Sequence, residues 1–167
     1  MPALFSTRGV RHKLCMEDLR DLGAKVIDNN GVNTDVIFDI GPTYIAYMYQ
    51  LTEDSTFIIE RRAPYAMGIG VFENEEEIVD LITEDIRQFR NAANSNHFLE
   101  FVQINSELAR LVRIFEDLYL YYNIDSDDIE EIHGSIIDVL RTIKDVEKRS
   151  KRAYQAKDPE VLHDIPL

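Results

Sequence analysis

The 167-residue chain contains a single cysteine, Cys15, and no tryptophan. One cysteine excludes an internal disulfide and a zinc site built from several cysteine ligands. Seven glycines and five prolines are too few for a collagen-like or low-complexity chain. No apolar run approaches the roughly 18 residues that a membrane span requires, and residues 1–13 lack the apolar stretch of a signal peptide. We therefore expect a cytoplasmic protein that does not associate with membranes.

Basic residues are scarce in the middle of the chain. The formal net charge is −13, and residues 73–140 carry 17 acidic and only 4 basic side chains. Nucleic-acid binding depends on clustered lysine and arginine side chains that contact phosphates. We therefore expect no direct nucleic-acid partner, but a protein partner with a basic or apolar surface. An acidic surface also leaves open that the protein mimics nucleic acid.

Motifs for cofactor binding, metal binding and catalysis are missing. The only Gly-x-Gly, at residues 68–70, lacks the third glycine of a dinucleotide fingerprint, and the acidic run 125–131 does not follow the spacing of a calcium loop. His12 and Cys15 lie three residues apart on a predicted helix, but no local motif completes a nucleophilic site, which favours a buried structural cysteine. The sequence therefore predicts no cofactor, no metal site and no catalytic residue, and it favours a protein that is not an enzyme.

The first half of the chain has the pattern of a helix followed by a small sheet. An amphipathic segment over about residues 10–22 precedes short β-rich segments that alternate with turn residues such as Asn29-Asn30-Gly31. Connections this short force neighbouring strands to be antiparallel, because a parallel crossover needs a dozen or more residues. We therefore predict an antiparallel meander of about five strands. The expected strands are 24–28, 34–40, 43–51, 56–62 and 67–72.

A well-marked helix follows the predicted sheet. Asn74 has the position of an N-cap, and Glu77, three residues later, completes the pattern of a capping box. Apolar residues then recur in steps of three and four up to Phe89, giving one stripe that can cover the sheet.

The last two helices carry the most regular apolar pattern in the chain. In both, apolar residues recur in alternating steps of three and four, which is the a/d seam of a coiled coil. The short connection at 123–126 predicts an antiparallel helical hairpin. Because the first of these helices has a wider apolar sector than one neighbour fills, we expect a homodimer through the seams, with packing on the sheet as the alternative. The predicted interface residues are Phe101, Ile104, Leu108, Leu111, Phe115, Leu118, Tyr122, Ile129, Ile132, Ile136, Val139 and Ile143.

These patterns together predict an α+β fold. It consists of an N-terminal helix, an antiparallel β-meander of about five strands, a covering helix and a long C-terminal antiparallel helical hairpin. The expected divisions are a sheet domain over 1–97, the hairpin over 98–156 and a flexible tail over 157–167, where Pro159 and Pro166 interrupt any period.

Two functional hypotheses follow. The first is an acidic protein–protein interaction module, of an adaptor or chaperone-like kind, that is homodimeric through its C-terminal helices. The second is a domain that binds a small molecule or anion, or an enzyme, with a pocket near Arg61, Arg62 and Tyr65. Adjacent strand residues point to opposite faces, so one of the two arginines is expected to point toward the core side or an end of the sheet. A pair of strand-end arginines that only compensates the following acidic helix is the competing structural interpretation.

Overall fold

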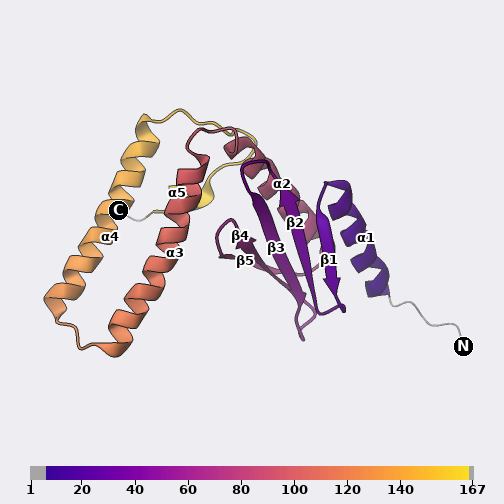
Figure 1. Cartoon of the computed structure of the whole chain (residues 1–167), viewed down its shortest axis with the longest axis horizontal. Coiled ribbons are helices and arrows are strands. Elements are labelled where there is room, and N and C mark those ends of the chain that lie inside the picture. The colour runs from indigo at the N-terminus through magenta and orange to yellow at the C-terminus, as the bar shows by residue number, and fades with distance from the viewer. Residues whose placement is uncertain (1–6, 166–167) are drawn as a thin grey trace, which may run out of the picture. The chain divides into compact units, whose positions relative to one another are not determined.

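The computed structural model describes residues 7–165, whose elements are shown in Figure 1. The predicted α+β class and the five-stranded antiparallel sheet are confirmed. The elements are α1 (Thr7–Asp21), β1 (Lys25–Asn29), β2 (Asn33–Asp39), β3 (Tyr44–Leu51), β4 (Phe57–Ala63), β5 (Met67–Phe72), α2 (Glu75–Ala92), α3 (Phe98–Tyr121), α4 (Ser126–Arg149) and α5 (Glu160–His163). The chain divides into two compact units between Leu111 and Val112, within α3.

The sheet of the first unit is a simple meander in the order β1-β2-β3-β4-β5, with all neighbours antiparallel. The turn between β1 and β2 places Asn30 and Gly31 at φ values of 58° and 71°. Asparagine and glycine tolerate this left-handed conformation better than other residues, so the local sequence favours a tight hairpin here. Pairing shifts by one residue between Ala46 and Tyr47 of β3, and again between Ile59 and Glu60 of β4.

Helices α1 and α2 cover one face of this sheet. Buried side chains alternate along β2 to β4 and share one core with Cys15 and Leu19 of α1 and with the apolar stripe of α2. The stripe consists of Ile78, Ile82, Ile86 and Phe89. Phe98, at the start of α3, completes the core. The first turn of α3 therefore packs with the sheet unit.

The start of α2 confirms the predicted N-cap. Asn74 Oδ1 accepts a hydrogen bond from the backbone N–H of Glu77 at 2.9 Å. The Glu77 carboxylate, in return, accepts from the backbone N–H of Glu73 at 3.0 Å, one residue earlier than in a standard capping box. The helix entry is thus fixed by two reciprocal side-chain hydrogen bonds.

The second unit contains the end of α3, helix α4 and the short helix α5. The chain reverses direction between α3 and α4 (Figure 1). Along α4, Ile137, Leu140 and Lys144 are half-buried, and no residue is fully buried. His163 Nε2 lies 3.5 Å from a Glu147 carboxylate oxygen, so part of the predicted tail contacts α4, while residues 166–167 lie outside the described part.

Although α3 and α4 span 24 residues each, no helix in the part of the chain that the structure describes is apolar enough to cross a membrane.

Several protonated groups are buried in the core, among them Cys15, Tyr47 and Tyr49. Burial raises the pKa of the Cys15 thiol to about 11, although the hydrogen bond between Cys15 Sγ and the Tyr49 hydroxyl, at 3.8 Å, acts in the opposite direction. Burial likewise raises the pKa values of Tyr47 and Tyr49. The folded protein therefore keeps protons at alkaline pH that the unfolded chain releases.

We expect the free energy of unfolding to fall as the pH rises above about 9, because the unfolded state then binds fewer protons than the folded state. Cys15 alone contributes a loss of about 2–3 kcal/mol by pH 11, at about 1.4 kcal/mol per pKa unit. Urea denaturation at intervals from pH 7 to 10.5 measures the loss. A Cys15→Ala variant should lose less stability over pH 9–10, and identical pH profiles for the two proteins would contradict the account.

Candidate functional site

The structure separates the two arginines that the sequence singled out. Arg61 points to the helix-covered face of the sheet and is 5% exposed, whereas Arg62 lies on the opposite face and is half exposed. Tyr65 follows in the turn between β4 and β5 and is buried next to Arg61. The structure therefore brings Arg61 and Tyr65 together and places Arg62 elsewhere.

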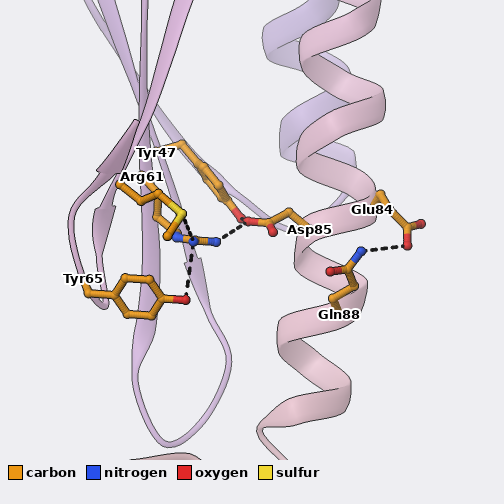
Figure 2. A network of polar contacts seen from close by, with 7 residues as sticks. Tyr47, Arg61, Tyr65, Glu84, Asp85 and Gln88 are labelled. Carbon is orange, nitrogen blue, oxygen red and sulfur yellow. Dashed lines mark hydrogen bonds and ion pairs between the residues drawn. The ribbon is translucent and has the colours of Figure 1, made fainter. Parts of the chain in front are cut away.

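Arg61 is the centre of a buried polar network that joins the sheet to α2. Its Nη1 atom donates to Asp85 Oδ2 at 2.9 Å, and the Tyr47 hydroxyl donates to the same oxygen at 2.5 Å. Figure 2 shows the two side chains converging from the sheet on this one carboxylate of α2. Burial and the neighbouring Asp85 carboxylate both raise the pKa of Tyr47, so its hydroxyl remains a donor. One acid on the covering helix thus satisfies one cation and one hydroxyl.

The remaining surface of the guanidinium is enclosed by rings. The Arg61 carbon Cζ lies 4.6 Å from the centroid of Phe89 and 4.8 Å from that of Tyr65, within the range of cation–π attraction. Its Nη2 atom lies 3.4 Å from the Tyr65 hydroxyl oxygen and 3.2 Å from the Met67 sulfur. The Nε atom is buried and has no hydrogen-bond partner among the described residues.

A cleft of about 280 Å³ adjoins this network. It is lined by Arg61, Tyr65, Asp85, Gln88, Phe89, Ala92 and Phe101. Gln88 Nε2 donates to Glu84 at 3.2 Å, also visible in Figure 2. An anion entering the cleft would have to compete with Asp85, which already neutralises Arg61. This geometry fits an internal ion pair that holds α2 on the sheet better than it fits an open anion-binding site.

Arg62 forms a surface ion-pair group on the open face of the sheet. Its Nε atom lies 2.9 Å from Glu60 and its Nη1 atom 3.3 Å from Asp35, two strands away. In the strand register Asp35 pairs with Met48 and Met48 with Glu60. Met48, only 7% exposed, therefore lies between the two acidic partners of Arg62. Arg62 is therefore paired with two surface carboxylates of the sheet, one on its own strand and one on β2.

The C-terminal helices expose most of their apolar seams. The α3 seam is Ile104, Leu108, Leu111 and Phe115, and the α4 seam is Ile136, Val139, Ile143 and Val146, with exposed fractions between 38% and 55%. In the second half of α4, the half-buried residues Ile137, Leu140 and Lys144 each follow directly after an exposed seam residue, whereas the seam residues Ile129 and Ile132 in the first half are themselves half-buried. The chain thus leaves both a/d seams without a full covering of its own.

The other predicted interface residues have mixed surroundings. Phe101 is 39% exposed, and its ring also packs against the core residues Tyr65, Phe89 and Phe98, with centroid distances of 5.8–6.4 Å. Tyr122 is exposed, and the remaining three are half-buried. These three are Leu118, Ile129 and Ile132.

Sequence analysis missed the acidic residues of the covering helix that face the core. Asp85 and Glu75 lie on the stripe of α2, at helical spacing from Ile78, Ile82 and Phe89. A carboxylate inside an apolar stripe is the pattern that indicates them, because charged residues are almost never fully buried unless they are paired.

Within residues 7–165 no group of three or more histidine, cysteine, aspartate or glutamate side chains is arranged to hold a metal ion.

Comparison with protein-family models, with curated proteins and with solved structures finds no match, so the function is argued from this chain's own residues.

Removing the Asp85 carboxylate from the buried network should lower the free energy of unfolding. Asp85→Ala leaves the Arg61 guanidinium buried without its carboxylate and deprives Tyr47 of its acceptor. We expect a loss of about 3 kcal/mol in the free energy of unfolding, at the lower end of the range for a broken buried pair because Asp85 is 20% exposed.

Arg62→Ala is the matched control, since its two ion pairs are largely exposed, and it should cost less than about 1 kcal/mol. Urea denaturation of both variants tests the difference. Equal losses would contradict the structural role given to the Arg61–Asp85 pair.

Proposed function

We propose that the protein is an acidic protein–protein interaction module that forms a homodimer through the α3 and α4 seams. The observation that supports this proposal is the exposure of eight large apolar side chains at heptad spacing on two long helices. Large apolar side chains exposed in a regular row along a helix are a mark of interaction sites on soluble proteins. Nothing in the described part of the chain covers these residues fully.

The energetics favour covering the seams. Long helices in proteins gain most of their stability from packing of an apolar face and little from intrinsic propensity. Burying the exposed half of a leucine or isoleucine side chain contributes about 1 kcal/mol. Eight such residues in each protomer are enough to drive association of two chains, after the entropic cost of docking is subtracted.

A second copy fits the seams for two reasons. Alternating steps of three and four are the spacing at which apolar knobs of one helix enter holes between residues of another. In addition, the first half of α4 carries four acidic residues and no lysine or arginine, whereas its second half carries four basic and three acidic residues. An antiparallel α4 pair related by a two-fold axis brings opposite net charges together, while a parallel pair places acid against acid.

The acidic middle of the chain supports a further partner. Residues 73–140 carry 17 acidic and 4 basic side chains, and Glu76 and Glu77 at the start of α2 are exposed. Such a surface attracts a protein with a basic patch through long-range electrostatic steering. An adaptor or chaperone-like role is consistent with a dimer that presents this surface twice.

Anion binding at Arg61 is the second candidate. It is supported by the cleft of about 280 Å³, but it is weaker because Asp85 already compensates the arginine's charge at 2.9 Å. Arg62 adds no positive charge to that cleft, since it lies on the other face of the sheet.

The double variant Leu108→Glu, Ile143→Glu tests the dimer. Both residues are exposed within one chain, at 46% and 43%, so the change leaves the fold of the protomer intact. In a dimer the two glutamates would be desolvated inside an apolar interface. We expect light scattering to give twice the chain mass for the wild-type protein and the single chain mass for the double variant.

Leu120→Glu is the control, because Leu120 is also exposed on α3 but lies outside the a/d seam. It should remain dimeric. A wild-type protein of single chain mass, or a Leu120→Glu variant that dissociates as the double variant does, would refute the assignment of the seams.

A further inference from the structure

A second pocket, separate from the Arg61 cleft, lies in the first unit where the start of α1, the β1–β2 turn, the ends of β3 and β4 and the start of α2 meet. Its volume is about 250 Å³, below the usual size of a drug-binding site and suited to a small ligand. Most of its wall is apolar, from Val32, Leu51, Phe57 and the Tyr49 ring. Three groups with ionisable or strongly polar side chains also line it, and these are Arg8, His12 and Glu75.

Glu75 is the unusual member of this pocket. It is the first residue of α2 and is 6% exposed, and its Oε1 atom is buried with no hydrogen-bond partner among the described residues. The positive end of a helix favours an acidic residue in the first turn, but this preference is met equally by exposed side chains such as Glu76. Helix capping therefore explains the presence of an acid at this end of α2 but not the burial of Glu75.

His12 supplies a second buried atom without a partner. Its Nε2 atom has no hydrogen-bond partner among the described residues. A neutral imidazole that carries its proton on Nδ1 presents Nε2 as an acceptor. The pocket thus contains two buried polar atoms, Glu75 Oε1 and His12 Nε2, that nothing in the described chain satisfies, and buried polar atoms of folded proteins normally have partners.

The aromatic wall is suited to a cation. The rings of His12 and Tyr49 lie 5.9 Å apart and those of Tyr49 and Phe57 lie 6.1 Å apart, both edge to face. The faces of Tyr and Phe rings attract ammonium groups, as in the aromatic sites that recognise quaternary ammonium ligands. Burial keeps the Tyr49 hydroxyl protonated, so this wall carries no negative charge of its own.

We propose that this pocket binds a small organic ammonium ion, whose N–H groups donate to Glu75 and His12 and whose hydrocarbon part contacts Tyr49 and Phe57. The site is independent of the dimer, because its lining includes no residue of α3 or α4. The cation supplies the positive charge and the donors that Glu75 and His12 lack.

Arg8 also lines the pocket, and its positive charge would favour an anionic ligand instead. Its guanidinium is exposed and donates to the Ser55 hydroxyl at 3.2 Å and to the Ser55 carbonyl at 3.0 Å. These hydrogen bonds hold it against the turn between β3 and β4, whereas the acceptors without partners are the buried ones. The test therefore compares ligands that differ only in charge.

Titration of the full-length protein with n-butylammonium, butyramide and butyrate at constant ionic strength, followed by amide NMR shifts, tests the proposal. We expect n-butylammonium to shift the amides of Gly9, Gly31 and Thr34 in a saturable way, and the other two probes to leave them unchanged. Glu75→Gln preserves the shape and removes the charge, and it should weaken binding by about tenfold or more. Glu76→Gln, the neighbouring exposed acid, should bind as the wild type does.

Thermal unfolding distinguishes a ligand site from a structural acid. Because Glu75 has an unsatisfied buried oxygen, the ligand-free Glu75→Gln variant should unfold at the wild-type temperature or above it. Stronger binding of butyrate, equal binding of n-butylammonium by Glu75→Gln, or no saturable shift with the wild type would each overturn the proposal. A lower unfolding temperature for Glu75→Gln would assign Glu75 to the fold and overturn it as well.

Discussion

The uncovered apolar seams of α3 and α4 are the constraint on which the rest of this molecule depends. A helix of 24 residues is about 36 Å long, more than a five-stranded sheet needs as a cover, and α2 already fills that role. Apolar side chains at every third and fourth position need a surface to pack on. A second copy offers apolar residues at the same spacing, and in an antiparallel pair the acidic half of one α4 would face the basic half of the other, which is the basis of the proposed interaction function.

In the sheet unit, a buried ion pair between Arg61 and Asp85 joins the sheet to α2. Arg61 and Asp85 bring one positive and one negative charge into a core that is mostly apolar and aromatic. A buried pair gives little net stability, but it penalises any arrangement of α2 in which the two charges fail to meet. Glu75, on the same stripe, has no such partner within the described chain. This contrast between one compensated and one uncompensated acid separates a structural network from a candidate ligand site.

Local patterns predicted most of the fold but not the polar contacts. Asn30-Gly31 defined the first hairpin and the stripe ending at Phe89 defined the covering helix, because turn conformation and helical period are local properties. Alternation also implied that Arg61 and Arg62 point apart. It could not tell which one is buried, because pairing shifts at two bulges and the partner Asp85 lies 24 residues away. Exposure of the seams likewise depends on tertiary packing, which a heptad pattern alone does not specify.

The oligomeric state of the wild-type protein tests the central claim most directly. Sedimentation equilibrium over a wide range of protein concentration, at low and at high salt, measures the mass without any substitution. The account predicts a dimer at micromolar concentration that persists in high salt, since apolar burial supplies most of the association energy. A monomer at every concentration would show that the seams remain uncovered in solution and would contradict the assignment of the protein as a homodimeric interaction module.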